Sequence, residues 1–189
     1  MLVLWIILGV ILFLILAIVI WAIGTFNALV RMRNNVEEAF STMDVYMKKR
    51  YDLVPNLVAT VKGYAKHESE TLEKVISARN MALNATTVEE KAEGEQALTS
   101  SLRELRNIVF EKYPDLKANT NFLDLQNQLK NIEGEIANSR KYYNACVKTY
   151  NVKIEVFPSS IIANMKKFEK KVLFTVEDPE ERKAVKVEF

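Results

Sequence analysis

No Asp, Glu, Lys or Arg occurs before Arg31, although the chain of 189 residues contains 26 Lys and Arg and 24 Asp and Glu. Within this uncharged start, residues 2–23 form a continuous apolar run dominated by Leu, Ile and Val. As an α-helix the run is about 33 Å long, and the hydrocarbon core of a bilayer is about 30 Å thick. The sequence therefore predicts a transmembrane helix, and we assign residues 1–26 to a membrane anchor.

Two tryptophans flank the apolar run in the pattern of an aromatic belt. Along a helix Trp5 and Trp21 lie about 24 Å apart, which places one ring near each membrane surface. The alternative is a cleaved signal peptide, which has a basic start, a shorter apolar core and a small-residue cleavage site. This chain starts without Lys or Arg and its run is long, so we expect a retained, single-pass anchor.

The charges that follow the run predict its orientation. Arg31 and Arg33 come directly after it, and three more basic residues stand at positions 48–50. Basic residues flanking a span stay in the cytoplasm, so we expect the N-terminus outside and the remainder of the protein inside. Trp5, Trp21, Arg31 and Arg33 are thus the expected membrane-interface residues.

Composition excludes several other classes of protein. No second stretch is long and apolar enough to cross a bilayer, which argues against a multi-span protein. The net charge of +2 and the pI near 8.5 are too balanced to indicate a nucleic-acid partner. One cysteine allows neither an intramolecular disulfide nor a cysteine zinc site, and five glycines and four prolines favour long helices over a turn-rich β fold.

Beyond the anchor, apolar residues recur at steps of three and four, which predicts a long helix that continues directly from the transmembrane segment. One turn of this face is skipped, at Arg50, and Pro55 predicts a kink or a short break. The expected apolar face consists of Val36, Phe40, Met43, Met47, Val54, Leu57, Val61 and Tyr64.

Three further helices are predicted. The second covers residues 69–84, and a capping box at Thr87 and Glu90 starts the third, which ends at Tyr113 and Pro114. The fourth is capped near Asn119 and ends at Pro158. Its seam is Phe122, Leu125, Leu129, Ile132, Ile136, Tyr143, Cys146, Tyr150, Ile154 and Phe157.

The first and fourth helices beyond the membrane have similar lengths and short connections. We therefore predict an all-α fold in which one transmembrane helix continues into an antiparallel bundle of three to four long helices, over residues 27–157. Residues 158–189 are predicted to form a short helix and an extended, charged tail, in which Val185, Val187 and Phe189 alternate with charges.

If the helices alternate in direction, the fourth returns the chain to the membrane. Lys166, Lys167, Lys170 and Lys171 follow it, and such a cluster attracts anionic lipid by about 1 kcal/mol per lysine. The alternative is a solvated basic patch on a short helix. Both interpretations stay open at the level of the sequence.

Signs of catalytic chemistry are sparse. His67, the single histidine, precedes Glu68, but Thr71 stands where a zinc peptidase motif needs a second histidine. Cys146 falls on the apolar seam of the fourth helix, where a cysteine packs as a small hydrophobic residue. We expect no enzyme, catalytic residue, metal, cofactor or small-molecule substrate.

Several polar and aromatic motifs occur together in this chain. In order they are RYDLVPNLV at 50–58, KGYA-x-HE at 62–68, YPDLKAN at 113–119, YYNA at 142–145, YN at 150–151 and FP at 157–158. With FN-x-LV at 26–30, AFS at 39–41 and the final VEF, they resemble the motifs of the LemA family over almost the whole chain. The resemblance implies an N-terminal membrane anchor followed by a long-helix bundle, in the cell (inner) membrane of a bacterium, with no established enzymatic activity.

Two functions fit this resemblance. The first is a structural scaffold that self-associates and organises a membrane or membrane-bound partners, as suggested by a family relative associated with magnetosome membrane formation. The second is a signalling or protease-associated adaptor that binds an unidentified membrane-associated protein. The motif residues have two interpretations as well: Tyr142, Asn144 and Asn151 either make hydrogen bonds within the bundle or form a partner surface.

Overall fold

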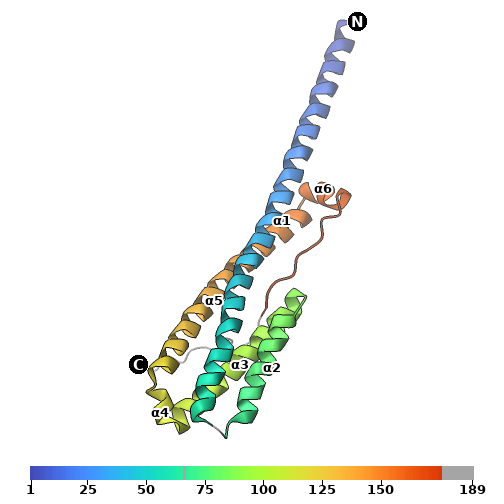
Figure 1. Cartoon of the computed structure of the whole chain (residues 1–189). Coiled ribbons are helices and arrows are strands. Elements are labelled where there is room, and N and C mark those ends of the chain that lie inside the picture. Colours follow the sequence, from blue (N-terminus) through green and yellow to red (C-terminus); the bar gives the residue numbers. More distant parts are fainter. Residues whose placement is uncertain (66, 176–189) are drawn as a thin grey trace, which may run out of the picture.

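The computed structural model describes residues 1–65 and 67–175 of the chain (Figure 1). This part is built of α-helices and contains no strand, which confirms the predicted all-α fold with a long apolar N-terminal helix. Its helices are α1 (Leu2–Tyr64), α2 (Ser69–Asn84), α3 (Val88–Lys112), α4 (Pro114–Lys117), α5 (Thr120–Glu155) and α6 (Ser159–Met165).

Helix α1 joins the apolar segment to the bundle without interruption. It contains 63 residues, and its N-terminal part projects alone beyond the other helices (Figure 1). By length and composition it is the one helix in the described ranges that can cross a membrane. The direct continuation predicted from the lack of a linker is thus confirmed, and it couples the apolar segment rigidly to the bundle.

Helices α1 and α5 pack side by side in opposite directions. The rings of Phe40 and Tyr143 stack edge to face, 5.6 Å apart, and the Asn119 amide donates a 3.0 Å hydrogen bond to the Tyr64 hydroxyl. The end of α1 at Tyr64 therefore meets the start of α5 at Asn119, as an antiparallel pair requires. The predicted apolar face of α1 is buried against α5 and α2 at Val36, Met43, Met47, Val54, Leu57 and Val61.

At Pro55 the sequence predicted either a kink or a short break. Helix α1 continues through Pro55, so the short break is absent. Val54 and Leu57, on either side of the proline, are fully buried. Packing therefore holds the helix together where propensity alone predicts an interruption.

The shorter helices form a hairpin against α1. The predicted bounds of α2 are confirmed, and the capping box of α3 is present: the Glu90 N–H donates to the Thr87 hydroxyl at 3.1 Å and the Thr87 N–H to the Glu90 carboxylate at 3.2 Å. Gly94 of α3 faces Ala82 of α2, where a Cβ atom added to Gly94 would lie 2.5 Å from the Ala82 Cα. The two helices therefore touch backbone to backbone.

Two predicted boundaries differ from the structure. The third helix was expected to end at Tyr113 and Pro114, but α3 ends at Lys112, and Pro114 is the first residue of the short helix α4, where the missing N–H costs nothing. Helix α5 ends at Glu155, so Phe157 does not continue its seam and is 81% exposed. The residue before a proline is disfavoured in the helical region of backbone space, and the exposed Phe157, unlike the buried Val54 before Pro55, has no packing that holds it there.

After α6 the chain reverses direction and runs back along α5. The reversal uses Lys167, which has φ 53°, and the N–H groups of Lys167 and Phe168 donate to the carbonyls of Asn164 and Ala163. This is the hydrogen-bond pattern of a Schellman motif. Residues 168–175 that follow are here called the strap. Val185, Val187 and Phe189 lie outside the described residues.

Candidate functional site

Exposed apolar and basic side chains surround α6. We call this set the α6 patch, and it consists of Phe157, Ile161, Met165, Lys166 and Lys167. Met165 is 72% exposed and Ile161 48%, and the two lie one helical turn apart, on the same face of α6. An exposed group of large apolar residues beside lysines is typical of a surface that contacts another phase or another molecule.

The α6 patch lies beside the point where the apolar segment of α1 meets the bundle (Figure 1). The Phe26 ring stacks edge to face on Phe168 at 5.9 Å, and the Lys166 ammonium lies 5.9 Å from the centre of the same Phe26 ring. The Arg33 guanidinium lies 5.7 Å from the Phe168 ring. Phe26 follows Trp21 by about 7.5 Å along the helix. The patch is therefore at the depth at which α1 leaves its apolar stretch.

The structure divides the predicted lysine cluster into two pairs. Lys170 forms an ion pair with Glu155 of α5, and the Lys171 ammonium lies 3.7 Å from the carboxylate of Glu37 in α1. These two lysines hold the strap to the bundle. The first two lysines of the cluster are exposed and have no acidic partner within the described ranges.

The other predicted interface residues lie along α1. Trp5 is 69% exposed and Trp21 39% exposed, as side chains of an unpacked helix are. Arg31 and Arg33 are exposed as well, just beyond the apolar segment. Trp5 is the more exposed of the two tryptophans, and all four residues are at the surface of the described structure.

Asn144 and Asn151 both bind the strap. The Asn144 amide donates to the Phe174 carbonyl at 3.0 Å and accepts from the Phe174 N–H at 2.9 Å. Asn151 forms the same pair of bonds with Lys171, at 2.8 and 2.9 Å. Each amide thus satisfies both main-chain groups of one residue, as a neighbouring strand would. Tyr142, by contrast, is 60% exposed.

Two tyrosines next to these asparagines complete the row. The Tyr143 hydroxyl donates to the Val172 carbonyl at 2.8 Å, and the Tyr150 hydroxyl to the Glu169 carbonyl at 2.9 Å. Burial raises the pKa of both phenols, which keeps them protonated as donors. Sequence reasoning noted the two Tyr-Asn pairs without their target. Their spacing of seven residues was the available signal.

A buried ion pair was missed from the sequence altogether. Arg50 is 2% exposed and donates to the carboxylate of Glu95 at 2.6 Å, and also to the Glu95 carbonyl and the Thr99 hydroxyl. It also lies 3.9 Å from Glu133 of α5, so one side chain of α1 links three helices. The skipped turn in the apolar face of α1 was the signal, because Arg50 stands where a core residue belongs.

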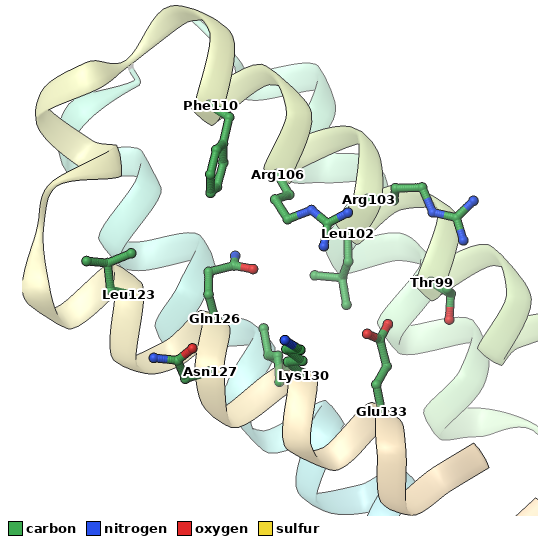
Figure 2. A pocket seen from close by; sticks show the side chains of 11 residues that line it. Thr99, Leu102, Arg103, Arg106, Phe110, Leu123, Gln126, Asn127, Lys130 and Glu133 are labelled. Carbon is green, nitrogen blue, oxygen red and sulfur yellow. The ribbon is translucent and has the colours of Figure 1, made fainter. Parts of the chain in front are cut away.

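A groove of about 460 Å³ opens between α3 and α5 (Figure 2). Thr99 and Glu133, which both contact Arg50, stand at one end of it, and its rim carries Arg103, Arg106 and Lys130. Its remaining lining residues are Leu102, Phe110, Leu123, Gln126, Asn127 and Leu129. The side chains form a cationic channel with an apolar floor and lack a nucleophile paired with a base.

The residues considered for chemistry do not meet. His67 lies in the turn before α2, and Cys146 is half-buried against the core, as its seam position predicts. Within residues 1–65 and 67–175, no group of three or more His, Cys, Asp and Glu side chains is placed to hold a metal ion. The features that this geometry offers are thus surfaces: the α6 patch, the strap and the α3–α5 groove.

Comparison with known proteins identifies a protein family and a curated relative. The model of the LemA family matches residues 39–189. A curated protein named Protein LemA, from Metamycoplasma hominis, is 28% identical over 141 residues, which is 75% of this chain. The chain spans 64% of the length of that relative. The match to the family model begins within α1, after the apolar segment, and includes α2 to α6 in full.

Proposed function

The chain belongs to the LemA family, and from this premise we propose that it is a non-enzymatic, membrane-anchored scaffold protein. The apolar segment of α1 is the anchor, and the bundle is the working part. A helix that continues unbroken from the anchor into the bundle holds the bundle at a fixed height and angle to the membrane. Such rigidity suits a protein that positions partners or lipid rather than one that transforms a substrate.

The observation that carries the proposal is the position of the α6 patch. The headgroup layer extends about 5–8 Å beyond the hydrocarbon core, and Phe26, which contacts Lys166, lies about that far from Trp21. The side chains of Ile161 and Met165 then enter the interface, while Lys166 and Lys167 meet anionic lipid. The bundle thus touches the membrane at a second point beside the anchor.

A depth measurement tests this second contact. The full chain, with Cys146→Ser, carries an environment-sensitive fluorophore on Met165→Cys and is placed in lipid nanodiscs with spin-labelled lipid. Met81→Cys is the matched control, because Met81 is also an exposed methionine but lies on α2. Quenching at position 165 with none at 81 supports the proposal. Equal signals at both positions contradict it.

We further propose that the bundle lies on the cytoplasmic side of the bacterial cell membrane, with the N-terminus outside. Arg31, Arg33, Lys166 and Lys167 are all on the bundle side of the span, which is the distribution that the positive-inside rule describes. Protease added to right-side-out vesicles should leave the bundle intact. Digestion of the bundle from outside would reverse the assignment.

Self-association is a separate part of the scaffold proposal. The apolar seams of α1 and α5 are buried against each other within one chain, so copies must associate through other surfaces, such as the anchor. Chemical cross-linking in membranes over a range of protein-to-lipid ratios tests this. If the protein is a monomer at every ratio, self-association is rejected, and the scaffold would act as a single copy.

The second candidate is an adaptor for a signalling or protease-associated partner. The α3–α5 groove favours it, because a cationic channel of this shape accepts an extended acidic segment. Co-purification from native membranes with the wild-type chain and with Arg106→Glu separates the two candidates. A partner lost in the variant supports the adaptor.

A further inference from the structure

We propose that residues 176–189 of the same chain continue the strap into the α3–α5 groove and bind there. This inference does not depend on the membrane proposal above. It rests on where the strap ends, on the register between the strap and α5, and on the charges of the groove.

The strap is aimed at the groove. Val172, Leu173 and Thr175 line a shallow hollow together with Ala92 and Gln96 of α3, while the strap's other side is bonded to α5. At Phe174 and Thr175 the strap therefore already lies between α3 and α5. It runs antiparallel to α5 (Figure 1), toward the part of that helix that lines the groove.

The register between strap and helix is regular. From Tyr150 to Tyr143 on α5 the bonded strap residue moves from Glu169 to Val172, and the two asparagine contacts repeat the same step. Three extended residues span about 10 Å and seven helical residues about 10.5 Å, so the two chains stay in step. This match lets the register be extended.

Two further steps lead to the groove. Counting from the pair Asn144 and Phe174, the first step pairs Ala137 with Glu177 and the second pairs Lys130 with Glu180. Lys130 lines the groove, and positions seven apart share nearly the same helix face. An acidic residue thus falls opposite a groove lysine without any adjustment of the register.

The charges of the two partners are complementary. Arg106 and Lys130 have no acidic partner within the described residues, and Arg103 adds a third positive charge to the rim. The sequence after Thr175 reads VEDPEE, which carries four carboxylates within six residues. Its proline favours an extended backbone. The segment is covalently attached to the strap, which ends near the groove. Its effective concentration at the groove is therefore higher than the concentration of a separate acidic peptide.

Cross-linking of the full chain tests the proposal. In the Cys146→Ser background, Glu180→Cys is combined with Lys130→Cys and treated with a short bis-maleimide. The control combines Glu180→Cys with Gln128→Cys, which is exposed on α5 but does not line the groove. We expect a cross-link within one chain for position 130 and at least fivefold less for position 128. Equal yields at both positions, or cross-links between chains, overturn the proposal.

A second variant tests the role of charge. Arg106→Glu, added to the Lys130→Cys pair, should lower the cross-linking rate by about fivefold at low salt, and high salt should lower the rate of the parent pair as well. A rate that responds to neither change overturns the assignment of the acidic segment to this groove.

Discussion

The Nε of Arg79 in α2 donates a hydrogen bond of 2.8 Å to the main-chain carbonyl oxygen of Tyr51 in α1. Tyr51 lies four residues before Pro55, whose ring nitrogen has no hydrogen to give it. A side chain from another helix therefore replaces the bond that the proline removes. This replacement explains how α1 passes through Pro55 intact while packing against α2.

The first prediction follows from this replacement. Arg79→Met should lower the free energy of unfolding by about 1–2 kcal/mol, because it leaves the Tyr51 carbonyl without a donor. In a Pro55→Ala background the same change should cost much less, since an alanine at this position supplies the helical N–H. Urea unfolding of the four proteins measures the difference. Equal costs in both backgrounds would disconnect Arg79 from the proline.

The second prediction concerns the buried ion pair. Glu95→Ala should destabilise the bundle by about 3–5 kcal/mol, because it leaves the Arg50 charge buried without its main partner. The double variant Arg50→Met, Glu95→Met should be more stable than either single variant, since the charge is gone. Thermal melts in detergent rank the proteins. If the stability lost by the double variant equalled the sum of the losses of the two single variants, the two residues would not be energetically coupled.

The third prediction uses pH. The Tyr51 hydroxyl is buried without a hydrogen-bond partner in the described structure, and burial, followed by the negative charge of Glu95, raises its pKa. The unfolded chain releases this proton above its ordinary pKa of about 10, but the folded chain does not. Its contribution to stability is therefore present below pH 10 and is lost as the pH rises further. Tyr51→Phe should flatten this alkaline loss relative to the wild type, with Tyr46→Phe, a half-buried tyrosine of the same helix, as the control.

The fourth prediction contrasts two helical glycines. Gly94→Ala should destabilise the protein by about 1–3 kcal/mol, because the new methyl group meets the Ala82 backbone. Gly134→Ala on α5 meets nothing within 4 Å, and should stabilise the protein by about 0.5–1 kcal/mol through helix propensity. Denaturant midpoints measure both. A stabilising Gly94→Ala would rule out the close approach of α2 and α3.

The fifth prediction separates the two interpretations of the Tyr-Asn motifs. Asn144→Ala and Asn151→Ala each remove two bonds to the strap, so both should lower the melting temperature and speed hydrogen exchange in residues 169–174. Tyr142→Ala should leave both measurements unchanged. If the asparagine variants instead lose oligomers with an unchanged melt, these residues form an interface between chains.

Local signals predicted the helices well. The Thr87 and Glu90 capping box and the Asn119 cap act within one turn, so a sequence reveals them directly. Proline effects were harder. Pro114 begins α4, where a helix needs no N–H from its first residue, whereas Pro55 sits within α1, where a side chain of α2 bonds the carbonyl that the proline leaves free.

Long-range polar partners were not visible in the sequence. Glu95 lies 45 residues from Arg50, and Phe174 lies 30 residues from Asn144. The positions of charged and amide side chains in a sequence follow no periodicity from which a partner 30 to 45 residues away could be identified. The sequence therefore indicated that Arg50 interrupts an apolar face, but its burial emerged only from the packing of three helices.

By itself the sequence determined the apolar segment, the all-α class, the antiparallel long helices and the motifs of the family, because hydrophobic period and capping are local properties. Tertiary structure alone decided that two members of the lysine cluster, Lys170 and Lys171, pair with carboxylates of the bundle and that the other two do not. It also decided that Asn144 and Asn151 hold a strap, and that a cationic groove lies ahead of that strap. These features depend on which distant segments come into contact. Chain direction and packing determine those contacts, and composition does not.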